Sequence, residues 1–233
     1  MNSTRKTAII VGALFLVSYC GVFIGSVFLD ILNAPDYLIN IFPNKIQVII
    51  GVLFELVNDA VVVGIAVLLF PLLKKHSESI ALWYVGFRII EAAMFIVGKV
   101  SALSLITLSQ EYIAAGAPDA SSFQALGALA LAGRYWAGEM AAIFFILGAL
   151  IFYSLLYQSK LLPRFISVWG LIAVALLITA KGLGVPDLTQ SFHPAMILYF
   201  PIVLNELFLA IWLIVKGFNS SAIASASESE KQI

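Results

Sequence analysis

Seven charged side chains within the long apolar runs of this 233-residue chain are candidates for chemistry. They comprise five acids and two arginines: Glu55, Asp59, Glu91, Glu139 and Glu206, with Arg88 and Arg134. A charge at the centre of a bilayer costs at least about 2.5–3.5 kcal/mol, so seven uncompensated charges would cost about 20 kcal/mol. Pairing or an aqueous cavity must offset this cost. We therefore expect these side chains to face the interior of a helical bundle.

The spacing of four of these residues places them on shared helix faces. Glu55 and Asp59 are four residues apart, with Asn58 beside them, and Arg88 and Glu91 are three apart within the apolar run 79–109. At the rise of a helix, all four lie near the middle of their spans. Two interpretations of Arg88 remain open: a buried ion pair with Glu55, Asp59 or Glu91 that fixes helix packing, or the counter-ion of a bound anion.

Four other charges lie closer to the ends of their runs. We expect Arg134 and Glu139 nearer the outer surface, where Arg134 either joins the charged cluster or anchors the helix at the interface beside its aromatic neighbours. Lys99 and Lys181 fall near the outer ends of their runs, and we expect them to extend to the interface.

A proline precedes the last two candidates. Pro201 falls inside the final apolar run, one turn before Asn205 and Glu206, and predicts a kink there. A kink exposes a backbone carbonyl near a carboxylate, an arrangement that some transporters use to bind ions. A simple polar pair between the two side chains is the alternative.

Acids outnumber bases by five to two among these seven side chains, and this excess favours chemistry that uses protons. Burial disfavours the charged form, so we expect at least one acid to exchange its proton near neutral pH. Such a group suits proton coupling or general acid–base chemistry.

Catalytic residues stay unassigned, because the sequence contains no G-x-S-x-G elbow, HExxH motif or P-loop. Neither His76 nor His193 lies in the middle of a run, so we expect no metal site and no cofactor. A site for a hard cation built from carboxylates alone is the alternative that the sequence leaves open.

Composition identifies the environment of these residues. Hydrophobic residues make up 62% of the chain and charged residues 11%, and the mean hydropathy is +1.04. Soluble domains have about 45–50% apolar and about 25% charged residues, so the sequence predicts an integral membrane protein with the lipid bilayer as its partner. The net charge is zero, which argues against a nucleic-acid partner. The single cysteine, Cys20, excludes an intrachain disulfide.

Six apolar segments are long enough to cross a bilayer, which takes roughly 20 residues each. They cover residues 7–29, 46–73, 80–107, 122–157, 162–183 and 194–215. The fourth is longer than one crossing requires, so its first part lies at the interface or the whole segment forms a long tilted helix. The sequence thus predicts an all-α bundle of six transmembrane helices.

The loop charges predict the orientation of this bundle. With both termini in the cytoplasm, only Lys45 lies on the outer side, against eight basic residues on the inner side: Arg5, Lys6, Lys74, Lys75, Lys160, Arg164, Lys216 and Lys231. Short loops predict a single transmembrane domain over residues 1–218. The small, polar residues 219–233 predict a disordered cytoplasmic tail.

Four stretches resemble a known family: LLKKHSESIALWYVGFRIIEA, SQEYIAAGAPDASSFQALGALAL, LPRFISVWGLI and NELFLAIWLIVKGF. Together they resemble the bacterial membrane family catalogued as domain of unknown function 4386. The resemblance implies a six-span, multi-pass protein of the bacterial cytoplasmic membrane, and it implies no catalytic residue or substrate.

Three functions remain open from the sequence. The first is binding or transport of a small polar or amphipathic solute, or of protons, at a polar cavity between spans two, three, four and six. The candidate binding or proton-coupling residues are Glu55, Asp59, Arg88, Glu91, Arg134, Glu139, Asn205 and Glu206. The second is an intramembrane enzyme that uses paired carboxylates on a lipid-like substrate. The third is a structural or sensory subunit whose charges set only helix packing. The sequence leaves the oligomeric state open.

Overall fold

The structure, a computed structural model, describes residues 3–117, 121–184 and 194–229. His193 and Lys231, which entered the predictions above, lie outside these residues. In the described ranges the regular structure is entirely helical and includes no β-strand. The all-α prediction is therefore confirmed.

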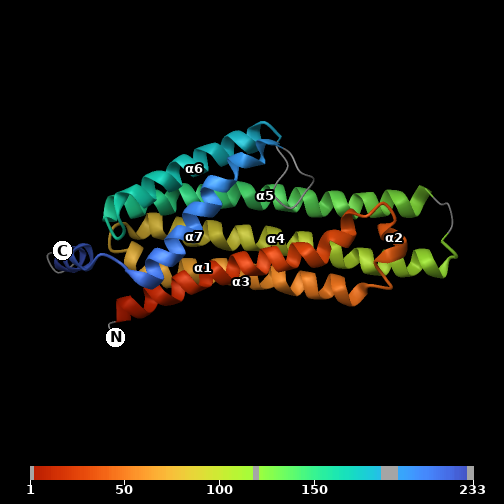
Figure 1. Ribbon diagram of the computed structural model, residues 1–233, viewed down its shortest axis with the longest axis horizontal. Helices are drawn as coiled ribbons and strands as arrows, with labels where there is room; N and C mark the ends of the chain where they lie inside the picture. The colour runs from red at the N-terminus through yellow and green to blue at the C-terminus, as the bar shows by residue number, and fades with distance from the viewer. Residues whose placement is uncertain (1–2, 118–120, 185–193, 230–233) are drawn as a thin grey trace. The chain divides into compact units, whose positions relative to one another are not determined.

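The described chain includes six long helices and four short ones (Figure 1). The long helices are α1 Ser3–Leu29, α3 Lys45–Leu73, α4 Glu78–Ala114, α5 Ser121–Ser159, α6 Arg164–Gly182 and α7 Phe200–Val215. The short ones are η1 Asp30–Asn33, α2 Tyr37–Asn40, η2 Pro194–Leu198 and α8 Ser220–Ser229. Six helical segments are long and apolar enough to cross a membrane, which confirms the six predicted spans.

Two of the spans are much longer than a bilayer requires. Helix α5 is a single helix of 39 residues, about 58 Å long, against a hydrocarbon core of about 30 Å. Helix α4 has 37 residues and continues to Ala114, beyond the predicted end at residue 107. The prediction ended α4 where its apolar run ended, but the residues that follow include the good helix formers Gln110, Glu111 and Ala114, which extend it.

The predicted kink at Pro201 is wrong. Helix α7 begins at Phe200, so Pro201 lies in its first turn. The N–H groups of a first turn have no partner within the helix, and proline there removes no hydrogen bond.

The polar tail also differs from the prediction. Residues Ser220–Ser229, which we expected to be disordered, form helix α8. Three of its ten residues are alanine, the residue with the highest helix propensity. Low hydropathy alone therefore did not identify this short helix.

The described chain divides into two compact units, each with its own apolar core. Unit 1 comprises Met1–Leu16, Val61–Ile89 and Phe144–Ile233, and unit 2 comprises Val17–Ala60 and Ile90–Ile143. Helices α1, α3, α4 and α5 contribute residues to both units and are continuous through the division. The single domain over 1–218 therefore stays a prediction.

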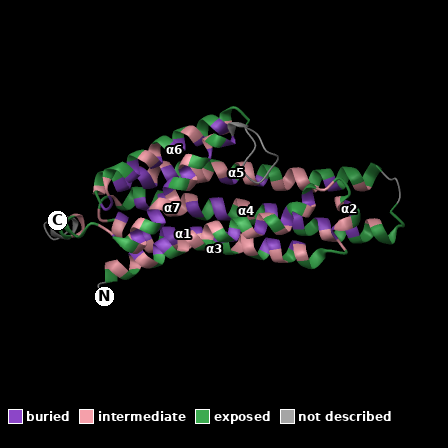
Figure 2. Cartoon of the chain, viewed as in Figure 1, coloured by how far each residue is buried: buried purple, intermediate pink, exposed green. Residues whose placement is uncertain are grey.

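Many large apolar side chains remain exposed along the helices (Figure 2). Phe23 is 71% exposed, Leu129 68% and Val100 60%. A soluble monomer rarely exposes this much apolar surface, whereas lipid-facing helices do so throughout. The chain is thus a multi-pass membrane protein by the length, hydropathy and outward faces of its helices.

Candidate functional site

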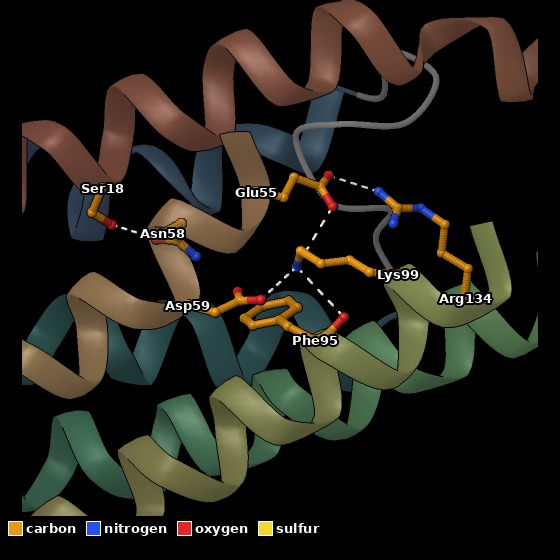
Figure 3. A network of polar contacts seen from close by, with 7 residues as sticks. All are labelled: Ser18, Glu55, Asn58, Asp59, Phe95, Lys99 and Arg134. Carbon is orange, nitrogen blue, oxygen red and sulfur yellow. Dashed lines mark hydrogen bonds and ion pairs between the residues drawn. The ribbon is translucent and has the colours of Figure 1, made fainter. Parts of the chain in front are cut away.

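Four charged side chains of unit 2 form a network with alternating signs (Figure 3). The Nζ of Lys99 lies 2.8 Å from Oδ2 of Asp59 and 3.6 Å from Oε2 of Glu55. The other oxygen of Glu55, Oε1, accepts a hydrogen bond of 2.7 Å from Nη2 of Arg134. Helices α3, α4 and α5 are thereby joined by an acid–base–acid–base sequence: Asp59, Lys99, Glu55, Arg134. We call these four residues the charge network.

Lys99 is the centre of the charge network. Only 4% of its surface is exposed, and its ammonium also donates to the carbonyl of Phe95 at 3.5 Å. Its Nζ lies 5.3 Å from the centre of the Phe95 ring, a cation–π distance. The prediction that Lys99 extends to the membrane interface is therefore wrong. Its helix continues 15 residues beyond it to Ala114, so Lys99 is not near a helix end.

The acidic side of the charge network comes from one face of α3. Glu55 and Asp59 are one turn apart, as their spacing predicts, and both contact the α4 cation. Asp59 is 2% exposed, and its Oδ1 accepts no hydrogen bond from the described residues. The neighbouring Asn58 accepts a hydrogen bond of 2.5 Å from the hydroxyl of Ser18 on α1, which holds this turn of α3 to α1.

Glycines bring the helices of unit 2 close together beside the charge network. A Cβ at Gly25 of α1 would lie 2.8 Å from Cγ of Glu55, and one at Gly21 would lie 2.8 Å from the carbonyl of Phe54. On the other side, Gly98 of α4 would place a Cβ 3.4 Å from the carbonyl of Arg134. Small residues allow membrane helices to approach this closely. The backbone of α1 thus lies close to the aliphatic part of Glu55, and the backbone of α4 lies close to that of α5 at Arg134.

Charge balance explains why the charge network is tolerated in an apolar environment. It contains two acids and two bases, so its formal charge is zero when all four groups are ionised. Exposure of the side chains rises along it, from 3% for Asp59 and 5% for Lys99 to 16% for Glu55 and 26% for Arg134. The Asp59–Lys99 end is therefore the drier end, where a change in charge costs most.

The Arg88–Glu91 stretch is divided between the two units. Arg88 belongs to unit 1, is 7% exposed and lies 5.4 Å from the ring of Phe145, a cation–π contact. Glu91 belongs to unit 2 and is 3% exposed. The cations that contact Glu55 and Asp59 are Lys99 and Arg134.

One feature of the sequence indicates that Lys99 faces the interior of the bundle. Glu91, Phe95 and Lys99 follow one another at intervals of four residues, so they share a face of α4. A lysine two turns from an inward-facing glutamate faces inward as well. For Arg134, the structure favours the cluster alternative over the interfacial anchor.

The other candidate residues, described next, are not part of the charge network. Glu139 is half-buried on α5 in unit 2. Asn205 is fully buried in unit 1, where its Nδ2 donates to the carbonyl of Ile166 at 3.0 Å and ties α7 to α6. Glu206 beside it is half-buried. No contact described here assigns Glu139 or Glu206 a ligand, and both stay candidates.

The described residues contain no group of three or more His, Cys, Asp or Glu side chains that could hold a metal ion. The charge network itself could hold a proton, or could exchange one of its ion pairs for a charged ligand. Its geometry presents no nucleophile beside a general base.

Comparison with known families covers nearly the whole chain. The model of the family described as "Domain of unknown function (DUF4386)" matches residues 10–217. The chain belongs to this family. The DUF4386 match begins within the first span, covers the other five spans completely, and includes every residue of the charge network. No curated protein and no solved structure matches the chain, so the assignment rests on the family alone.

Proposed function

We propose that this DUF4386 protein is a membrane transport protein that couples movement of a small polar or amphipathic solute to proton exchange at Asp59 and Lys99. One observation carries the proposal. Asp59 and Lys99 meet at 2.8 Å, both almost fully buried, on helices long and apolar enough to cross a membrane. Ionisable groups inside spans are rare and commonly mark ion, proton or solute pathways.

The alternating order of the charge network supports proton exchange. A proton taken up by Asp59 neutralises its carboxylate and weakens its attraction for Lys99. The ammonium is then free to approach Glu55, which it already contacts at 3.6 Å, while Arg134 holds the other oxygen of Glu55. Protonation therefore changes how α3 is held to α4. A change of this kind can shift the balance between two conformations of a transporter.

Two candidate acids of unit 2 lie outside the charge network: Glu91 on α4 and Glu139 on α5. They are proposed as further sites of proton exchange, because ionisable groups inside spans commonly mark proton pathways. The candidate residues of unit 1, Arg88, Asn205 and Glu206, are proposed as solute contacts.

Infrared titration of Asp59→Asn tests proton exchange. We expect wild type to show a protonated-carboxyl band that grows between about pH 9 and about pH 4, with the component assigned to Asp59 missing in the variant. Asp36→Asn, which changes an exposed acid of the same type in the same unit, is the matched control and should retain that component. An identical titration of wild type and Asp59→Asn would refute the proposal.

A purely structural role is the second candidate, and the charge balance of the network favours it. Two acids and two bases that pair fully can fix the packing of α3, α4 and α5 without exchanging protons. If the role is only structural, the double variant Asp59→Asn/Lys99→Met should recover the stability that either single change removes. Solute uptake into proteoliposomes should then be the same for the double variant as for wild type. Under the transport proposal, the double variant recovers stability but loses proton-dependent solute uptake into proteoliposomes.

A further inference from the structure

A pocket of about 510 Å³ lies in unit 1, where α6 begins and α7 ends. Three exposed basic residues, Lys160, Arg164 and Lys216, line it, and its described lining includes no acid. Its volume is within the range of about 300–1,000 Å³ that is typical of small-molecule sites. Three cations around a hollow of this size favour an anionic ligand.

The helix ends at the pocket reinforce its positive potential. Helix α6 begins at Arg164, so the positive end of its dipole is at the pocket. The negative end of α7 is neutralised by Arg5, which donates to the carbonyls of Leu213 at 3.1 Å and Ile214 at 2.6 Å. Gly217 permits this contact: its φ is +76°, and a Cβ there would lie 2.8 Å from Nη1 of Arg5.

Backbone and ring contacts hold the pocket walls in place. The N–H of Asn219 donates to the carbonyl of Leu161 at 2.9 Å, and its side chain donates to the carbonyl of Lys160 at 3.4 Å. The guanidinium of Arg164 lies 5.0 Å from the centre of the Tyr157 ring. Two of the three cations are therefore attached to fixed segments.

An aromatic strip leads from the pocket along α6 and α7. Trp212 lines the pocket and lies 6.1 Å from Phe165 and 6.0 Å from Phe208, measured between ring centroids. Phe208 in turn lies 5.8 Å from Trp169, which is about 7 Å further along α6 than Arg164. Phe165 is 52% exposed. This strip offers an apolar surface next to the cations, as an acyl chain below a phosphate requires.

We propose that this pocket binds a phosphate group, and that the aromatic strip selects the phosphate of an anionic phospholipid. Basic pockets between membrane helices bind lipid headgroups through this combination of cations and adjoining apolar surface. In the predicted orientation, the pocket faces the cytoplasmic leaflet. The proposal is independent of the charge network, with which it shares no residue.

Binding of short-chain phosphatidylglycerol to the full chain in detergent tests the proposal, with phosphatidylcholine and glycerol 3-phosphate as companion probes. The test variant is Lys160→Gln/Lys216→Gln. Its matched control is Lys6→Gln/Lys74→Gln, which removes two exposed lysines of unit 1 that do not line the pocket. We expect the test variant to bind phosphatidylglycerol about 30-fold more weakly, and the control less than about 3-fold.

The probes separate the two sources of phosphate. Tight binding of phosphatidylglycerol with weak binding of glycerol 3-phosphate identifies a lipid site, and equal binding of the two identifies a soluble phosphate ester. Equal losses in the test and control variants, or phosphatidylcholine binding as tightly as phosphatidylglycerol, would overturn the proposal. If the glutamine variant does not fold, Lys160→Arg/Lys216→Arg takes its place: it keeps both charges, so loss of binding there would contradict the proposal.

Discussion

Replacement of Lys99 by methionine leaves Asp59 without the cation that lies 2.8 Å from it. Asp59 is 2% exposed and has no other charged partner among the ion pairs of the described residues, so its charge would be stranded. Removal of one partner from a buried ion pair typically costs about 3–5 kcal/mol. For a protein of this size, each kcal/mol lowers the unfolding temperature by about 2–4 °C. We expect Lys99→Met to lower it by about 6–20 °C.

Thermal unfolding in detergent, followed by tryptophan fluorescence, measures this effect. Lys45→Met is the matched control, because Lys45 is an exposed lysine of the same unit and its replacement should cost less than about 0.5 kcal/mol. The double variant Asp59→Asn/Lys99→Met should recover most of the loss, since it removes the stranded charge. The loss in Lys99→Met should also shrink as the pH falls, because protonation neutralises Asp59. If Lys99→Met unfolds at the same temperature as Lys45→Met, the buried pair does not stabilise the fold and our reasoning fails.

Three further predictions concern elements of unit 2. Gly25→Val should cost about 1–3 kcal/mol, because even its Cβ would lie 2.8 Å from Cγ of Glu55; an unchanged thermal unfolding temperature would contradict the close approach of α1 and α3. The hydroxyl of the buried Ser109 donates a hydrogen bond to the carbonyl of Leu38 at 2.6 Å, so Ser109→Ala should lower the free energy of unfolding by about 1–3 kcal/mol. The same change should speed amide hydrogen exchange over residues 37–44 but not over residues 100–108. Burial raises the pKa of Tyr37 above 10.0, so the stability it contributes is present below about pH 10 and lost as the pH rises through its folded pKa. Tyr37→Phe should remove part of the alkaline loss of stability, and a superimposable alkaline unfolding curve would show that Tyr37 ionises normally.

The sequence alone predicted the membrane class, the six spans and the inward face of α3. Each of these depends on local properties: the number of consecutive apolar residues and a spacing of four along one helix. The errors were local as well. Each error concerns where a helix begins or ends, which hydropathy locates poorly. The features concerned are the extension of α4 to Ala114, the first-turn position of Pro201 and helix α8.

The partners within the charge network could not be predicted in this way. The sequence placed Arg88 near the acids and Lys99 at the interface, whereas the structure pairs Glu55 and Asp59 with Lys99 and Arg134. Which cation meets which acid depends on how helices are rotated and shifted against one another. Those quantities follow from close contacts such as Gly25 against Glu55 and Gly98 against the backbone of Arg134.

The sequence by itself thus determined that this chain must bury charges inside a membrane bundle, because apolar length and helical periodicity are local and additive. Only the tertiary structure decided which charges pair, because an ion pair between helices requires two side chains far apart in sequence to reach within about 4 Å, and packing alone sets that distance.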